Sequence, residues 1–272
     1  MSPSSSSTST SSKTILFLGA TGGVGLSALR RSLAANHTCI ALCRTPSNLT
    51  SQLMPQGQTP PANLHIVQGD AHDAAVIARC LSPTAAADRS GGPVDTVVFS
   101  IGARPTLRGM SDPHVCERGI TALLAALRET REARSTQGGK GQGQGKEQKK
   151  VRLMVVSTTG ISDVTRDVPL AMLPLYKVML HTAHMDKRAM ERLVMASGDA
   201  TDWTIVRGSL YTNGPATEGL VRVGMDDPVR GVLETKPAIG YTISREDVGK
   251  WVFDECIEGS DKWVGKAAMI TY

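Results

Sequence analysis

A glycine-rich turn near the start of the chain is the feature that most clearly points to chemistry. It follows an apolar run at residues 14–18 and leads into a helical pattern of leucines. A strand, a tight turn and a helix N-terminus bring backbone N–H groups and the helix dipole to one point, where a pyrophosphate can bind. We expect Gly19 to form the turn, Gly22 to admit the phosphates and Gly25 to let the helix pack on the strand. The predicted cofactor-binding turn comprises Gly19, Ala20, Thr21, Gly22, Gly23, Val24 and Gly25.

Polar side chains follow the next two apolar runs of the chain. Arg44 comes just past the run at 38–42, where an arginine suits the 2′-phosphate of NADP and a carboxylate would suit the 2′-hydroxyl of NAD. Because Arg44 has no acidic neighbour there, the pattern favours NADP. After the run at 64–67, Asp70 is placed to accept a hydrogen bond from the adenine amine, and Ala71 follows it.

A fourth apolar run, at residues 95–99, ends in Ser100, Ile101 and Gly102. These small residues would let a dinucleotide lie across the strand ends. Ligands of doubly wound sheets bind at the carboxyl ends of the strands, and here four successive runs carry small or polar residues at that end. The sequence therefore predicts an α/β fold, a Rossmann-like doubly wound parallel sheet with a dinucleotide site.

Several motifs together resemble the atypical short-chain dehydrogenases/reductases. The chain is most similar to their single-domain NAD(P)H-binding members, typified by flavin reductase (biliverdin-IXβ reductase), and more distantly to NmrA-like proteins. The similarity spans about residues 14–272. Besides the glycine turn, it rests on Arg44, Gly69-Asp70, Ser157-Thr-Thr-Gly160, Asp202-Trp-Thr-Ile-Val-Arg207 and Ile243-Ser-Arg-Glu-Asp-Val248. The resemblance implies that Ser157 lies beside the nicotinamide and that Thr159 matches an active-site serine of flavin reductase.

The resemblance also implies a catalytic Tyr-x-x-x-Lys pair, which this chain lacks. Lys187 matches the lysine that binds the ribose hydroxyls, but Ala183 stands where the tyrosine would be. His184 shares a helix face with Lys187 and is a candidate proton donor. The alternative is a polar histidine on a cleft wall or on the surface. The pocket histidine of flavin reductase is also absent, because its position falls near Leu210.

Four further residues are candidates for the substrate pocket: Arg104, Tyr176, Arg207 and Tyr211. Arg104 could bind an acidic or phenolate substrate, or could be an exposed loop residue. Tyr176 lies eleven residues before Lys187, so on one continuous helix it would be roughly 16 Å away along the axis. We therefore expect it near the mouth of the pocket rather than at the reacting atoms.

Composition narrows the possible functions. The 272 residues carry a net charge of +5, but the segment 137–150 alone contributes a local excess of positive charge, so no nucleic-acid surface is indicated. The five cysteines are odd in number and lack Cys-x-x-Cys spacing, which argues against a disulfide framework or a zinc site. No stretch of 18 apolar residues and no targeting signal is found, so we expect a cytoplasmic protein away from membranes.

The order of the predicted elements indicates one domain. We expect a disordered Ser/Thr-rich tail at 1–13 and an NAD(P)-binding domain at 14–272 with a small C-terminal substrate lobe, interrupted by flexible insertions near 82–93 and 137–150. Predicted strands are 14–18, 38–42, 64–67, 95–99, 151–157, 203–206 and 267–271. Predicted helices are 24–35, 73–81, 113–131, 176–197 and 245–257, the last capped by Ser244.

These features favour an NADPH-dependent oxidoreductase that reduces a flat conjugated acceptor such as a flavin, a quinone or a polyketide. An acceptor of this kind can take its proton from solvent, which the missing tyrosine requires. The alternatives are a non-catalytic NADP(H)-binding sensor and an isomerase, epimerase or cyclase that retains the cofactor site. The expected partner is a small-molecule substrate, and the expected state is a monomer or weak homodimer.

Overall fold

A computed structural model describes residues 12–54, 59–82, 92–103, 105–106, 109–110, 112–138, 149–217 and 220–272. The strands are β1 (Thr14–Leu18), β2 (Thr38–Cys43), β3 (Leu64–Gln68), β4 (Thr96–Phe99), β5 (Pro105–Thr106), β6 (Gly109–Met110), β7 (Val151–Thr158), β8 (Thr201–Gly208), β9 (Leu210–Thr212), β10 (Arg222–Asp227), β11 (Val232–Leu233), β12 (Thr242–Ser244) and β13 (Lys266–Thr271). The helices are α1 (Gly23–Ala34), α2 (Pro46–Leu53), α3 (Ala74–Leu81), α4 (Val115–Gly138), α5 (Leu173–Val178), α6 (His181–Met195) and α7 (Arg245–Trp251), which a π-helical segment continues to Ile257.

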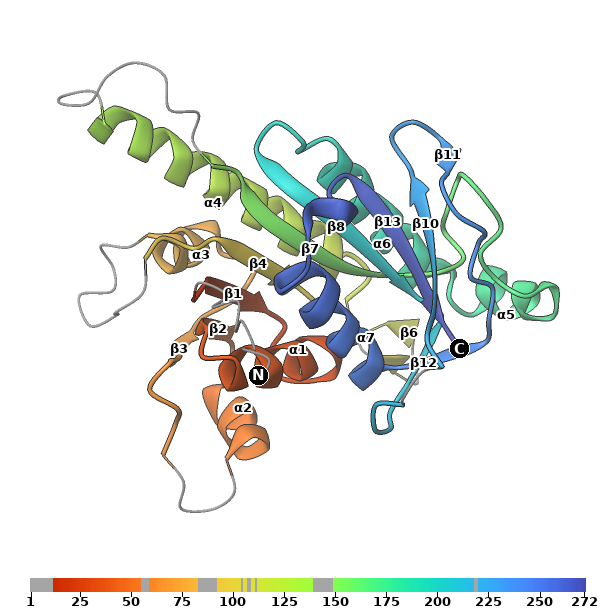
Figure 1. Cartoon of the computed structure of the whole chain (residues 1–272), viewed down its shortest axis with the longest axis horizontal. Coiled ribbons are helices and arrows are strands. Elements are labelled where there is room, and N and C mark those ends of the chain that lie inside the picture. The colour runs from red at the N-terminus through yellow and green to blue at the C-terminus, as the bar shows by residue number, and fades with distance from the viewer. Residues whose placement is uncertain are drawn as a thin grey trace, which may run out of the picture.

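One large sheet forms the centre of the molecule (Figure 1). Its strand order is β11-β10-β13-β8-β7-β4-β1-β2-β3, and the seven strands from β13 to β3 are parallel. Among the described strands of this sheet, β10 runs antiparallel to both of its neighbours, β13 and the edge strand β11. The predicted doubly wound, Rossmann-like α/β fold is confirmed. Because the parallel strands share one direction, the ends of β1, β2, β3, β4, β7 and β8 lie along a single edge.

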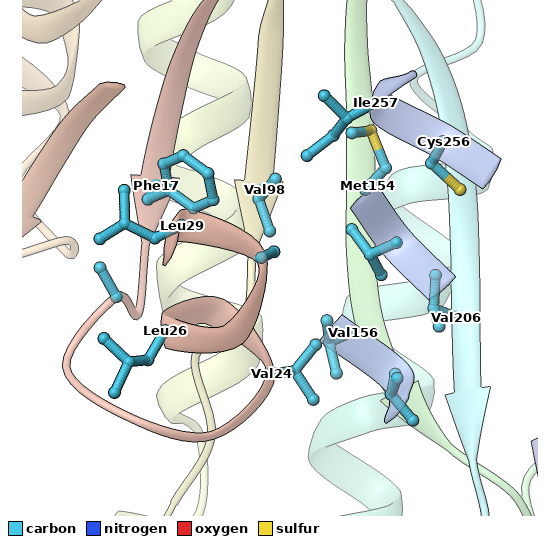
Figure 2. Close-up of a cluster of buried hydrophobic side chains, with 14 of the residues drawn as sticks. Phe17, Val24, Leu26, Leu29, Val98, Met154, Val156, Val206, Cys256 and Ile257 are labelled. Carbon is cyan, nitrogen blue, oxygen red and sulfur yellow. The ribbon is translucent and has the colours of Figure 1, made fainter. Parts of the chain in front are cut away.

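Helices cover both faces of the sheet, and each face has its own core. α1 and α7 pack on one face, while α3, α4 and α6 cover the other. Neighbouring residues of a strand alternate between the faces, so Phe17 packs under α1 and Leu16 packs toward α4. Figure 2 shows part of the core on the face covered by α1 and α7, where side chains of α1 and of the segment after α7 meet those of the strands. Both faces are thereby buried, as parallel sheets require.

Two predicted helices differ from the structure, and other elements were not predicted. The expected helix 176–197 is two helices, α5 and α6, separated at Met179 and Leu180. The expected helix 113–131 extends to Gly138, so the insertion predicted from 137 begins within a helix, and residues 139–148 lie outside the described residues. Helix α2 and strand β10 were not predicted. Pro46 at the start of α2 is a signal that could have indicated that helix.

Ser244 caps α7 as predicted, since its Oγ accepts a hydrogen bond from the Asp247 backbone N–H at 3.0 Å. The Asp247 carboxylate also accepts hydrogen bonds from the Thr217 backbone N–H and the Tyr272 hydroxyl. This carboxylate therefore joins α7 to a loop of the C-terminal region. Within the described part of the chain, every helix is too short or too polar to cross a membrane.

Candidate functional site

The glycine turn between β1 and α1 is built by close approach of the end of β4. Gly19 has a φ of 98°, which a side chain would strain, and a Cβ there would lie 2.7 Å from the Ser100 carbonyl carbon. A Cβ on Gly25 would lie 2.2 Å from Ser100 Oγ and 2.5 Å from the Gly19 carbonyl oxygen. Ser100 Oγ itself donates to the Gly19 carbonyl at 3.1 Å. These two glycines therefore hold the turn against β4.

Gly22 differs, because its surroundings are open. No atom lies within 4 Å of a Cβ placed on Gly22. Gly22 is also the N-cap of α1, where no side chain accepts from the first N–H groups and the first turn carries no acidic residue. Free N–H groups, the helix dipole and an open glycine surface fit the pyrophosphate of a dinucleotide. In the rest of the turn, Ala20 and Val24 are buried, and the Thr21 carbonyl accepts from Gln52 Nε2 at 2.8 Å.

The residues predicted for the adenosine half lie at the same edge of the sheet. Arg44 is exposed and directly follows β2. Asp70 lies just past β3, with a side chain 52% exposed and Oδ1 accepting from the His72 backbone N–H at 3.0 Å. Ala71 is half-buried beside it, and a Cβ on Gly102 would meet no atom within 4 Å. The edge is therefore open from β1 to β3, as an extended dinucleotide would need.

Lys187 connects two strand ends. Its Nζ donates to the carbonyl of Val156 in β7 at 2.8 Å and to that of Ile101, just past β4, at 3.0 Å. An ammonium group has three donors, so one is left for a ligand. The preceding residue, Asp186, accepts from the backbone N–H groups of Cys116 and Glu117 at 2.9 and 2.8 Å and so fixes α6 on the first turn of α4. Asp186 was not among the predicted site residues.

Tyr176 is buried against two other predicted site residues, Thr159 and His184, rather than standing at an open pocket mouth. Its hydroxyl oxygen is 3.4 Å from Thr159 Oγ1, and its ring centroid is 5.3 Å from that of His184. The expected separation of roughly 16 Å from Lys187 assumed one continuous helix, which the chain does not form here. Because the chain turns between α5 and α6, Tyr176 folds back over Gly160, where a Cβ would lie 2.4 Å from the tyrosine ring. Thr159, Tyr176 and His184 are all buried.

His184 is one of several described residues that carry buried polar atoms without a hydrogen-bond partner. Among the described residues, five buried side-chain polar atoms have no hydrogen-bond partner, and four of them belong to Ser157, Asp167, His184 and Asp226. Such atoms are costly unless a ligand or water binds them. Burial lowers the pKa of His184 to about 4, with Arg188 and His181 adding to the effect. The imidazole is therefore neutral at pH 7, which disfavours the predicted role of a charged proton donor.

Arg207 is not available to a substrate in the way predicted. Its guanidinium is buried, donating to Glu191 Oε2 at 2.7 Å through Nη2 and to Asp226 Oδ2 at 2.9 Å through Nη1. A free arginine would be costly to bury, so the two carboxylates account for its position. Here Arg207 joins β8 to α6 and β10 and supports the wall of the site.

The structure describes Tyr211 but not Arg104, the other two residues predicted for the pocket. The Tyr211 hydroxyl donates to the Ser157 carbonyl at 2.8 Å and accepts from the Gly208 N–H at 3.1 Å, so it fixes the end of β7. Arg104 lies outside the described residues. Asp167, whose Oδ1 accepts from the Gly160 N–H at 2.8 Å, was missed. No sequence pattern near Asp167 indicated this role, because only the folding of the chain brings Asp167 beside Gly160.

Comparison with known proteins agrees with this geometry. A family model described as NAD(P)H-binding matches residues 19–257. The chain is 37% identical to "Reductase pytE" of Aspergillus terreus, over 97% of this chain and 100% of that protein. It is 33% identical to "Oxidase pynE" of Aspergillus niger, over 96% and 99% of the two chains.

Among solved structures, the oxidoreductase ylbE from Lactococcus lactis has the same fold. It matches with a TM-score of 0.64 and 16% identity, over 94% of this chain and 90% of that one. Together with the glycine turn and the parallel sheet, these matches show that the chain belongs to the NAD(P)H-binding family and is an oxidoreductase.

Proposed function

We propose that this protein uses NADPH to reduce a flat conjugated acceptor, such as a flavin, a quinone or a polyketide. The observation that carries the proposal is the buried group of Thr159, Tyr176 and His184 at the end of β7, the strand whose Val156 carbonyl binds Lys187. The name of one relative, "Reductase pytE", supports the same direction of reaction.

The cofactor half of the site has a separate group for each part of a bound NADPH. The glycine turn and the N-terminus of α1 would bind the pyrophosphate, Arg44 would pair with the 2′-phosphate, and the free donor of Lys187 would reach the ribose hydroxyls. When bound, the nicotinamide would supply hydride to the acceptor. The protein's own task is to bind the acceptor and to donate hydrogen bonds to its carbonyl oxygen.

The acceptor half contains two hydroxyl groups for that task. Burial raises the pKa of Tyr176 above its ordinary value, so the phenol stays protonated at neutral pH and can donate a hydrogen bond. Thr159 Oγ1, 3.4 Å away, can donate to the same acceptor oxygen. The two hydroxyls would hold negative charge that develops on a carbonyl oxygen during reduction. Neutral His184 packs against the tyrosine ring and would orient it.

An apolar surface next to Tyr176 suits the acceptor class. Leu170, Val178 and Met179 are 67%, 76% and 75% exposed and flank the ends of α5. Exposed apolar side chains gathered at a site often mark a binding surface. A flat conjugated acceptor would find apolar side chains there, at the two ends of the helix that carries Tyr176.

The proposal is tested by NADPH consumption with quinones, flavins, aliphatic ketones and aldehydes in parallel. We expect quinones or flavins to react and simple ketones to fail, because neither candidate donor is a strong acid at neutral pH: the pKa of the Tyr176 phenol is raised, and the imidazole of His184 is already neutral. Binding of NADPH without turnover of any acceptor would contradict the proposal and favour a sensor. Equal dissociation constants for NADPH and NADH would contradict the NADPH assignment.

A pair of variants tests the acceptor half. Tyr176→Phe removes only the hydroxyl and should lower kcat by about 10²-fold, while NADPH affinity stays unchanged. His184→Gln should cost much less, because the imidazole is neutral and donates no proton. The reverse order of effects, with activity lost in His184→Gln and a flattened pH profile, would instead make the histidine the proton donor.

A further inference from the structure

Arg245 lies directly against the glycine turn, although 222 positions separate it from Gly23. A Cβ on Gly23 would lie 3.1 Å from Arg245 Cδ, and Gly23 itself has a φ of 58°. Arg245 Nη1 donates to the Tyr211 carbonyl at 3.2 Å and to Asn213 Oδ1 at 3.0 Å. The guanidinium is 5.7 Å from the centre of the Tyr211 ring. Its side chain therefore spans from the glycine turn to the loop after β9.

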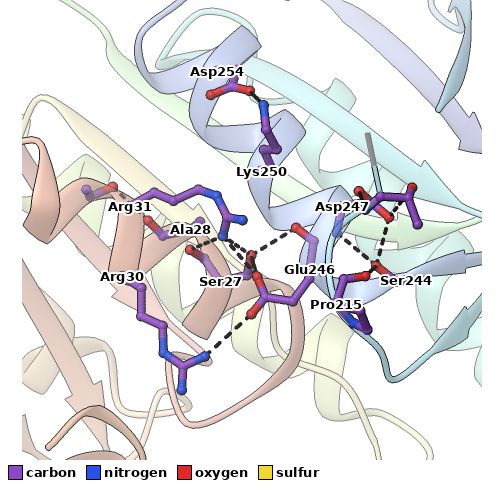
Figure 3. Close-up of polar contacts among 12 residues, drawn as sticks. Ser27, Ala28, Arg30, Arg31, Pro215, Ser244, Glu246, Asp247, Lys250 and Asp254 are labelled. Atoms are coloured by element: carbon purple, nitrogen blue, oxygen red, sulfur yellow. Dashed lines mark hydrogen bonds and ion pairs between the residues drawn. The ribbon is translucent and has the colours of Figure 1, made fainter. Parts of the chain in front are cut away.

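The first turn of α7 is held firmly in this place by α1. Glu246 Oε2 accepts from Ser27 Oγ at 2.7 Å and from Arg31 Nη1 at 2.9 Å, as Figure 3 shows. One turn later, a Cβ on Gly249 would lie 2.3 Å from Ser27 Cβ, so the two helices cross in close contact. Arg245 is thus positioned by packing on both sides and does not depend on a flexible loop.

Arg245 also differs from its neighbours in its charge partners. Within the part of the chain that the structure describes, no carboxylate lies within 4.0 Å of its guanidinium, whereas the neighbouring Arg31 pairs with Glu246. A guanidinium has five N–H donors, and the two bonds of Nη1 leave the donors of Nε and Nη2 for another partner. A half-buried cation in this state is stabilised when an anion binds beside it.

We propose that Arg245 is a pyrophosphate-binding residue that meets the phosphates from the side opposite the backbone of the glycine turn. The inference rests on the proposed use of a dinucleotide. The guanidinium can donate two N–H groups to phosphate oxygens while Nη1 keeps its contacts with Tyr211 and Asn213. Because Tyr211 also holds the end of β7 through its hydroxyl, phosphate binding would steady the acceptor side of the site as well.

The experiment compares dissociation constants for NADPH, NADH and 2′-AMP, measured by calorimetry. The variants are Arg245→Met, which keeps the apolar stem over Gly23, and Arg44→Ala. Lys250→Ala, an exposed residue of the same helix paired with Asp254, is the control. Arg245→Met should weaken NADPH and NADH by the same factor, about tenfold to a hundredfold, and leave 2′-AMP unchanged. Arg44→Ala should weaken NADPH and 2′-AMP but not NADH.

The affinities of the Arg245 variants distinguish a role at the pyrophosphate from the other possible roles. Loss of affinity for NADPH alone in Arg245→Met would place this arginine at the 2′-phosphate and overturn the proposal, as would unchanged affinity for both dinucleotides. If the wild-type protein binds neither dinucleotide, the proposed function fails together with the inference. Arg245→Lys separates charge from geometry: it should recover part of the affinity, because a lysine keeps the charge but cannot bind two oxygens in the same plane. Melting temperatures of all variants should match the wild type within a few degrees.

Discussion

Replacing Asp167 by asparagine should make the protein more stable at neutral pH. Asp167 is 2% exposed, Oδ1 accepts from the Gly160 N–H at 2.8 Å, and Oδ2 has no partner. Burial raises the pKa of this carboxyl from 3.8 to about 6, even though the Gly160 N–H and the charge of Arg207 pull it down. Ionisation of Asp167 at neutral pH therefore lowers the stability of the folded protein. Asparagine keeps the shape and the acceptor oxygen but carries no charge.

The sign and size follow from linkage. Between pH 3.8 and about 6 the unfolded chain has lost the Asp167 proton while the folded protein retains it. The contribution of this group to stability is therefore complete below pH 3.8 and declines as pH rises to about 6. At about 1.4 kcal/mol for each pH unit, the loss approaches about 3 kcal/mol. Asp167→Asn should exceed the wild type by up to that amount at neutral pH and match it near pH 4.

Urea unfolding of both proteins at about pH 4.5 and pH 7.5 measures the difference. The depressed pKa of His184 is present in both proteins and cancels in the comparison. Asp163→Asn, with a side chain 78% exposed in the same loop, is the matched control and should change the free energy of unfolding by less than about 0.5 kcal/mol at either pH. A stability difference that is constant with pH, or that favours the wild type at neutral pH, would refute the reasoning.

Three further predictions follow from the site. Gly22→Val should abolish NADPH binding and leave the melting temperature unchanged, because a Cβ there meets no atom, whereas Gly25→Val should also destabilise the protein by roughly 1–3 kcal/mol or more through overlap with Ser100. Lys187→Ala should weaken NADPH binding by roughly 1–3 kcal/mol in calorimetry, and full affinity in the variant would remove the lysine from the ribose site. Arg207→Ala should lower the free energy of unfolding by roughly 3–5 kcal/mol in urea titration, since it leaves Glu191 and Asp226 buried without a cation; a loss below about 1 kcal/mol would mean that water reaches them.

The alternation of strands and helices and the glycine turn could be predicted because both depend on short stretches of chain. Apolar runs of four to eight residues separated by helical patterns indicate a parallel sheet whatever surrounds them. The spacing of Gly19, Gly22 and Gly25 likewise reflects what one turn requires of its own backbone. Arg44 and Asp70 could be placed at the ligand edge because each directly follows a strand.

What only the tertiary structure decided is which distant side chains meet. Tyr176 reaches Thr159 because the chain breaks between α5 and α6, and no local pattern indicated that break. Arg207 reads as an available cation in the sequence, yet β10 and α6 bring two carboxylates to it. Arg245 belongs to the glycine turn only because α7 packs on α1. Backbone conformation follows from neighbours in sequence, whereas burial, ion pairing and pKa depend on partners that long-range packing supplies.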